Sequence, residues 1–102
     1  MTRRLKIAGV QMNPKFMDNS GNLQVILRHL EKEAAEGAHL IVFPECSVSG
    51  YCFESLQEAV PFAEAIPGPA TTAVVTACTR LNVHAIFGLL EQEGTSLYNA
   101  AV

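Results

Sequence analysis

Three apolar runs, separated by stretches with helical periodicity, constrain the fold of this chain more than any other feature of its sequence. The runs occupy residues 5–12, 39–43 and 83–90, and polar residues, glycine or proline bound each of them. Short apolar runs that contain β-branched residues and end at such positions are typical of buried strands. We therefore predict three buried strands here.

Two segments between the runs have the spacing of amphipathic helices, in which apolar side chains return every three or four residues. The first follows Asn19 or Ser20, either of which can cap a helix, and ends at Gly37. The second begins near Pro69 and closes at Asn82. The apolar faces consist of Leu23, Ile26, Leu27, Leu30 and Ala34 in the first helix, and of Ala70, Ala73, Val74, Ala77, Cys78 and Leu81 in the second.

The order of these elements predicts an α/β layered domain. The first two strands should be parallel and joined by a right-handed crossover. Residues 54–65 have only weak helical character, which Pro61 interrupts. The run at 83–90 and a fourth strand at 97–102 should form an antiparallel hairpin around a turn at 91–95. Because the sequence stops inside that fourth strand, we expect residues 1–102 to be a single partial domain, truncated at its C-terminus.

Composition excludes several classes of protein. With 49% apolar and 17% charged residues, the chain has the make-up of a globular domain rather than a disordered one. Its net charge is −3 and its basic residues are scattered, so we expect no nucleic-acid partner. No segment has the length of a membrane span or the pattern of a basic membrane-surface helix, so we expect no membrane partner.

Cysteine usage indicates a reducing compartment. Cys46, Cys52 and Cys78 are odd in number and form no Cys-x-x-Cys pair, so neither a disulfide framework nor a zinc site is indicated. Arg3-Arg4 precedes an apolar stretch that is too short and too interrupted for a signal peptide. We therefore expect a cytoplasmic protein that uses no metal and no cofactor.

The segment Ile41-Val42-Phe43-Pro44-Glu45 places one carboxylate directly after a buried strand. Proline favours an extended residue before it and cannot donate to the sheet, so the chain should leave the sheet at this point. Ligands of open α/β sheets bind beyond the carboxyl ends of the strands. From this pattern alone a solvated loop acid is the commoner outcome, because loop acids are mostly exposed. The role of Glu45 therefore depends on the rest of the chain.

Several short segments form an ordered pattern along the chain. They are Ile7-Ala8-Gly9-Val10-Gln11, Asn22-Leu23, the stretch from Gly37 to Glu45, Gly50-Tyr51, Pro67-Gly68-Pro69, Phe87-Gly88-Leu89 and Tyr98-Asn99. Each segment alone is a weak signal, and together they cover nearly the whole chain. In order and spacing they resemble the first part of a nitrilase-superfamily (carbon–nitrogen hydrolase) protein.

The resemblance implies the N-terminal part of a four-layer α-β-β-α sandwich with a mixed sheet, and a Cys-Glu-Lys catalytic set. Glu45 matches the family's general base, and Tyr51 is a candidate substrate-binding residue. The family's lysine and nucleophilic cysteine belong to motifs that would follow Val102. The resemblance also implies a small-molecule amide, nitrile or N-carbamoyl substrate and a homo-oligomeric protein. We therefore expect a parent protein that hydrolyses non-peptide C–N bonds, and an isolated chain that is inactive.

Two other classes of protein are compatible with an α/β chain of this length. A nucleotide-binding domain should have a glycine-rich loop after its first strand, and residues 13–19 contain no glycine. A non-catalytic structural or assembly fragment remains the alternative, since only one of the three catalytic residues is present. Cys46 adjoins Glu45, but neighbouring side chains of an extended segment point apart, so we do not expect it to act as the nucleophile.

The last two strands carry expectations of their own. Tyr98 and Asn99 are assigned to strand packing and to a turn or backbone hydrogen bond. If later residues complete the sandwich, apolar side chains of these strands should be exposed on one face. An unpaired apolar edge and a large apolar patch both promote association, so the isolated chain should self-associate.

Overall fold

The computed structural model of the chain describes residues 2–102, and strands and helices alternate in it as the sequence predicts. In chain order the elements are β1 (Ile7–Gly9), α1 (Asn19–Ala35), β2 (Leu40–Val42), α2 (Leu56–Ala59), a 3₁₀ turn η1 (Val60–Phe62), α3 (Pro69–Leu81), β3 (His84–Ile86), β4 (Gly88–Glu93) and β5 (Ser96–Ala101). The expected weak helix near Pro61 is thus the short pair α2 and η1.

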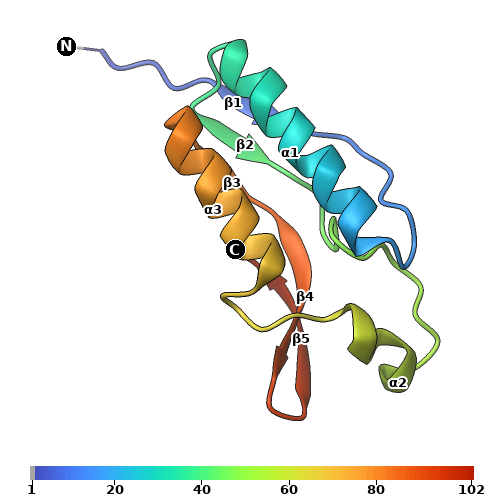
Figure 1. The fold of residues 1–102 in the computed structure, drawn as a ribbon. Helices are drawn as coiled ribbons and strands as arrows, with labels where there is room; N and C mark the ends of the chain where they lie inside the picture. The colour runs from blue at the N-terminus through green and yellow to red at the C-terminus, as the bar shows by residue number, and fades with distance from the viewer. Residues whose placement is uncertain (1) are drawn as a thin grey trace.

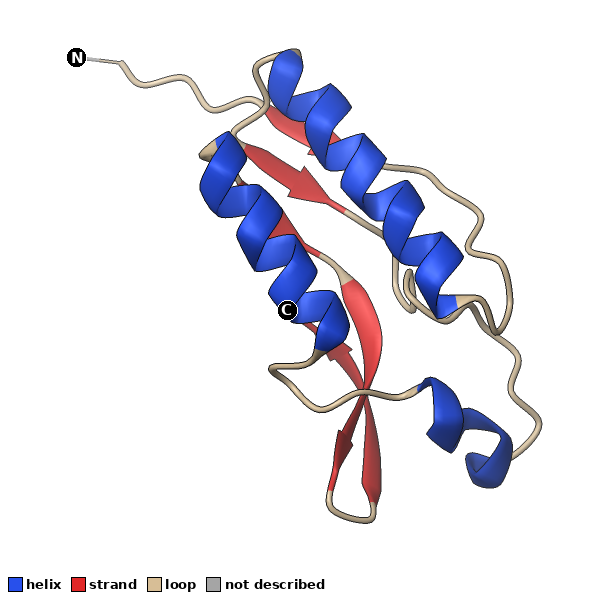
Figure 2. Cartoon of the chain, viewed as in Figure 1, coloured by secondary structure: helices blue, strands red, loops and turns tan. Residues whose placement is uncertain are grey.

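Strands β1, β2 and β3 form a parallel sheet with β2 in the middle, which confirms the parallel pairing predicted for the first two strands. Helices α1 and α3 lie side by side over one face of this sheet (Figure 1). Strands β4 and β5 form a separate antiparallel hairpin, drawn beyond the end of the parallel sheet in Figure 2. The chain is therefore an α/β layered structure that contains both parallel and antiparallel pairs.

The two faces of the parallel sheet have different surroundings. Ala8, Ile41 and Ala85 are aligned across the three strands, and Ile41 is fully buried in the core. The helices supply the other side of this core through Ile26 and Leu30 of α1 and Val74 and Ala77 of α3. On the opposite side of the sheet the apolar side chains of Leu5, Ile7, Leu40 and Ile86 line a shallow depression together with His39 and His84. We call the four apolar residues the open face.

The N-terminal cap of helix α1 lies one residue before the first of the two predicted caps. Asp18 is the capping residue, and its carboxylate accepts a hydrogen bond from the N–H of Gly21 at 3.1 Å. Asn19 instead donates from Nδ2 to the carbonyl of Phe62 at 2.9 Å. Asp, Asn and Ser cap helices about equally well, so a run of three such residues does not identify the cap. The prediction of Asn19 or Ser20 as the cap was wrong for this reason.

Helix α3 agrees with the prediction at both ends. Pro69 occupies its first turn, where the missing N–H of proline carries no cost. Asn82 closes the helix in the left-handed conformation, with φ at 55°. Among residues 2–102, no helix combines the length and the apolar character that crossing a membrane requires.

The predicted third strand at residues 83–90 is two strands in the structure, so this prediction was wrong. β3 pairs with β2, whereas β4 pairs with β5. Between them Phe87 exchanges two backbone hydrogen bonds with Val102, each 3.0 Å long. Both segments are apolar, and hydrophobic periodicity carries no mark of a change of sheet. The predicted turn at 91–95 is likewise only Gly94-Thr95, because β4 continues to Glu93.

The exposure expected for the last strands is confirmed in part. Ile86, Tyr98 and Val102 are all at least two-fifths exposed, with Ile86 at 41%. Leu89 of β4, however, is buried in the core, so the expectation was wrong for that side chain. The strand β1 adds a still more exposed residue, Ile7, at 60%. Apolar exposure is therefore spread over the open face and the hairpin.

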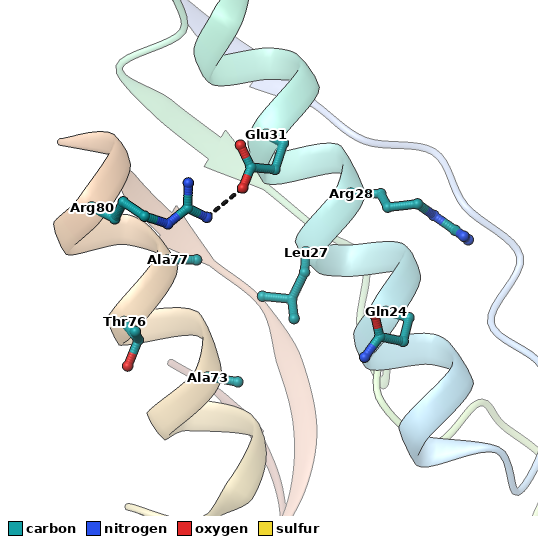
Figure 3. A pocket seen from close by; sticks show the side chains of 8 residues that line it. All are labelled: Gln24, Leu27, Arg28, Glu31, Ala73, Thr76, Ala77 and Arg80. Atoms are coloured by element: carbon teal, nitrogen blue, oxygen red, sulfur yellow. Dashed lines mark hydrogen bonds and ion pairs between the residues drawn. The ribbon is translucent and has the colours of Figure 1, made fainter.

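A groove of about 430 Å³ runs between α1 and α3 (Figure 3). Leu27 and Ala77 line it, and Arg80 of α3 forms an ion pair with Glu31 of α1 across it. Both charged side chains are more than half exposed, so solvent screens their attraction. The groove shares no lining residue with the surroundings of Glu45.

Candidate active site

Glu45 lies where β2 leaves the parallel sheet. The N–H of Phe43 donates to the carbonyl of Ile86 at 2.8 Å, and this backbone hydrogen bond ends the pairing of β2 with β3. Pro44 follows and has no N–H to continue the ladder. Glu45 then starts a turn that runs to Ser49. The local sequence thus sets the acid at the carboxyl end of the middle strand, as predicted.

The turn at residues 45–49 is buried and fixed, although the Glu45 side chain itself is exposed. Ser47 and Ser49 are both fully buried and satisfied, and the hydroxyl of Ser47 donates to the carbonyl of Gly88 at 3.0 Å. The N–H of Val48 donates to the same carbonyl at 3.3 Å. Buried polar groups that all find partners hold one conformation, so the turn is a rigid support for the Glu45 side chain.

Asn22 ties this turn to the first helix. Its Oδ1 accepts from the N–H of Lys15 at 2.7 Å, and its Nδ2 donates to the carbonyls of Lys15 and Val48 at 2.8 Å each. The side chain is almost completely buried, so its bond to Val48 is shielded from water, while the two bonds to Lys15 are partly buried. This explains physically why an asparagine stands in the pattern at Asn22-Leu23.

Gly88 allows the hairpin to approach the turn closely. A Cβ atom at this position would lie 2.6 Å from the backbone nitrogen of Cys46 and 2.8 Å from the Cα of Glu45. No real Cβ atom tolerates such distances, so only glycine fits here. The start of β4 is therefore packed directly against the backbone of the acid.

Both oxygens of the Glu45 carboxylate accept hydrogen bonds. Tyr51 donates from its hydroxyl to Oε2 at 3.1 Å, and Asn99 of β5 donates from Nδ2 to Oε1. Asn99 also accepts at Oδ1 from the thiol of Cys46, with 3.7 Å between the heavy atoms. The structure thus brings the predicted residue Tyr51 to Glu45. It also adds Asn99 to the site, whose predicted role was packing or a backbone bond.

Two groups beside the carboxylate, the Cys46 thiol and the Tyr51 hydroxyl, have raised pKa values. Burial raises the pKa of the Cys46 thiol, and the nearby charge of Glu45 raises it further. Desolvation also raises the pKa of the Tyr51 hydroxyl, and its hydrogen bond to Glu45 raises that pKa further. Both groups therefore keep their protons near neutral pH and act as donors.

Cys46 lacks the environment of a nucleophile. Reactive thiols are partly exposed and have a lowered pKa, whereas Cys46 is 7% exposed and its pKa is raised by burial. Its backbone is in the left-handed region at φ 47°, which few residues other than glycine adopt. Strained residues of this kind cluster at functional sites, and here the strain lies next to the acid.

A cavity of about 300 Å³ lies beside Glu45. Its walls come from the end of β2, from the junction of β3 and β4, and from β5, where Asn99 and Ala101 contribute. This is the position at which open α/β sheets bind ligands. Among residues 2–102, no three side chains capable of binding a metal gather in one place.

Comparison with known proteins gives the family. The profile of the Carbon-nitrogen hydrolase family matches residues 6–102. A nitrilase of Pyrococcus abyssi is 34% identical over 99 residues, covering 96% of this chain and 38% of the relative. An omega-amidase, NIT2, of Danio rerio is 29% identical over 97 residues, covering 94% of this chain and 33% of the relative.

Solved structures agree with the sequence relatives. XC1258 of Xanthomonas campestris, described as a CN-hydrolase superfamily protein with an arsenic adduct in its active site, superposes with a TM-score of 0.82 and 25% identity. That match covers 98% of this chain and 36% of the other. An N-terminal amidase superposes with a TM-score of 0.81 over 95% of this chain and 24% of the other, at 21% identity.

The layered α/β fold of this chain matches the fold of a CN-hydrolase superfamily protein over about a third of that protein's length. The chain belongs to the carbon–nitrogen hydrolase family. It spans less than two-fifths of the length of the Pyrococcus abyssi nitrilase, at 38%.

Proposed function

We propose that the whole protein to which these residues belong hydrolyses an amide, nitrile or N-carbamoyl group of a small molecule, and that Glu45 is its general base. The observation that carries this proposal is the Glu45 carboxylate, fixed by two donors at the carboxyl end of β2 beside a cavity. Relatives named nitrilase and omega-amidase support the class of reaction.

The chemistry requires a base because the electrophile is weak. Glu45 would take the proton of a cysteine thiol, and the thiolate would form a new S–C bond to the substrate carbon. Glu45 passes that proton to the substrate nitrogen, which leaves as ammonia or an amine when its bond to carbon breaks. The carboxylate of Glu45 then takes a proton from the water that attacks the same carbon and displaces the sulfur, which regenerates the cysteine. A lysine and backbone N–H groups would stabilise the negative oxygen or nitrogen that develops. The family resemblance implies that this cysteine and this lysine follow Val102.

Tyr51 has a second proposed role beside its bond to Glu45. Its ring is nearly half exposed at the site, so one side of it is free to contact a substrate. Aromatic rings with a polar end suit such positions because they pack and donate together. We further propose that the whole protein is a cytoplasmic homo-oligomer; the three free cysteines of residues 2–102 support the reducing compartment, and the family resemblance supports the oligomer.

The test is ammonia release by the whole protein from a panel of amides, nitriles and N-carbamoyl compounds. Glu45→Gln keeps the shape of the side chain and cannot accept a proton, so turnover should fall by about 10²- to 10⁴-fold. Glu93→Gln, in the exposed end of the hairpin, is the matched control and should retain turnover. Near-normal turnover by a folded Glu45→Gln protein would show that Glu45 is not the base.

Residues 1–102 alone should release no ammonia from the same panel, because Cys46 is buried and its pKa is raised by that burial. Losing a nucleophile commonly removes most of an enzyme's acceleration. Turnover by the isolated chain that disappears in Cys46→Ala would contradict the proposed assignment.

A further inference from the structure

We propose that Asn99 is a positioning residue for the general base, and that Cys46 sets the orientation of the Asn99 amide. This inference rests on the proposed role of Glu45. It concerns how the carboxylate is aimed, whereas the proposed function concerns what the carboxylate does.

The first step is the orientation of the carboxylate. Glu45 is exposed, and an exposed glutamate can rotate about its terminal bond unless its oxygens are held. Tyr51 holds Oε2 from one side, and Asn99 holds Oε1 from the other. Without Asn99, only the hydroxyl of Tyr51 would restrain the group, and a single bond leaves that rotation open.

The second step is the orientation of the amide. An asparagine side chain has a donor end and an acceptor end that are nearly identical in shape, so it can occupy either of two flipped positions. The Cys46 thiol lies 3.7 Å from Oδ1 and can supply the proton that this oxygen needs. Flipping the amide would remove that bond and turn the amide oxygen toward a carboxylate oxygen. Together with the carboxylate of Glu45, Cys46 therefore sets the position in which Nδ2 faces Glu45.

The third step is the rigidity of the support. Asn99 is paired with Leu90 across the hairpin, and Gly88, two residues before Leu90, is paired with Ala101, two residues after Asn99. The carbonyl of Gly88 accepts bonds from the turn that carries Glu45. The hairpin and the acid are thus joined through the backbone, so β5 delivers Asn99 at a fixed distance.

The test uses the whole protein and compares Asn99→Leu with Gln92→Leu. Both substitutions replace an amide on the same hairpin, but the Gln92 side chain donates to the carbonyl of Gly94 in the turn and makes no bond to Glu45. Asn99→Leu should lower kcat about 10- to 100-fold with KM nearly unchanged, because small misplacements of a catalytic group cost that much. Gln92→Leu should leave both constants unchanged.

Two further comparisons separate positioning from a purely structural effect. In a Glu45→Gln background, Asn99→Leu should cause no additional loss, since residues that act as a unit are not additive. Cys46→Ala should lower kcat less than Asn99→Leu, and Cys46→Ser, which restores a donor, should recover part of the loss.

The outcomes distinguish this inference from the proposed function. If Glu45→Gln is inactive while Asn99→Leu keeps wild-type kcat, positioning is overturned and the base assignment stands. An equal loss from Asn99→Leu in both backgrounds would also overturn it, because Asn99 would then act independently of Glu45. Wild-type turnover by Glu45→Gln would instead remove the base assignment itself.

Discussion

The two faces of the β1–β2–β3 sheet both carry apolar side chains, yet only one of them is covered by helices. Ile41 points into the core under α1 and α3 and is 0% exposed, whereas Ile7 on the neighbouring strand points to the open face and is 60% exposed. Parallel sheets are normally covered on both sides, and their strands are apolar throughout for that reason. The comparison teaches that these strands have the composition of a sheet that is covered on both faces. Residues 2–102 cover only one face, with helices α1 and α3.

The family membership gives this difference a structural meaning. The chain spans 38% of the Pyrococcus abyssi nitrilase, and the resemblance implies a sandwich in which two sheets face one another. We propose that the open face is an interior surface of the whole protein, covered by residues outside this chain. A contiguous exposed apolar surface is typical of such an interface.

The largest expected effect contrasts two isoleucines on adjacent strands. In residues 1–102, Ile41→Ala should lower the free energy of unfolding by about 2–5 kcal/mol, because it leaves a cavity in the core. Ile7→Ala should change it by less than about 0.5 kcal/mol, because the side chain is mostly in water already. Urea unfolding at low protein concentration measures both. Equal losses would mean that the two faces do not differ as described.

The second prediction concerns association of the isolated chain. Ile7→Glu should weaken self-association by about tenfold or more, because a charge in an apolar interface is costly. Val75→Glu on α3 is the matched control, since Val75 is 62% exposed and lies outside the open face. Sedimentation across a concentration series measures the effect. A monomeric wild-type chain at high concentration would refute the prediction, and so would an equal effect of both substitutions.

The fold and the site differ in how far the sequence predicts them. Periodicity located both long helices, and the strand followed by Pro44 and Glu45 located the acid, because these signals are local. The break at Phe87 was missed because it depends on which sheet each strand joins. The contact between Asn99 and Glu45 was missed because it spans 54 residues and depends on the register of the hairpin.

A third, smaller effect compares Cys46, within the turn at the site, with Cys52, which follows that turn. Cys46 is buried and burial raises its pKa above the ordinary 9.0, whereas Cys52 is exposed. At pH 8, iodoacetamide should modify Cys46 at least about tenfold more slowly than Cys52. The rate at Cys46 should stay low until the pH passes 9.0, since only the thiolate reacts. Peptide mapping by mass spectrometry reads each site, and equal rates would contradict the buried placement.

The smallest expected effect is at the groove between the helices. Arg80→Gln removes the ion pair with Glu31 that Figure 3 shows, but both side chains are more than half exposed. The free energy of unfolding should fall by less than about 1 kcal/mol, and the difference should shrink in high salt. Thermal or urea unfolding at two salt concentrations measures it. A loss as large as that of Ile41→Ala would show that the packing of the helices on the sheet is stabilised mainly by this ion pair rather than by the apolar core.

The claim that the open face is an interior surface of the whole protein is tested most directly by labelling one position on it. Ile7→Cys and Val75→Cys place thiols at positions that are 60% and 62% exposed in this chain. At concentrations at which residues 1–102 are monomeric, both should react rapidly with a maleimide. In the whole protein, position 75 should still react and position 7 should be protected. Equal labelling of both positions in the whole protein would contradict the claim.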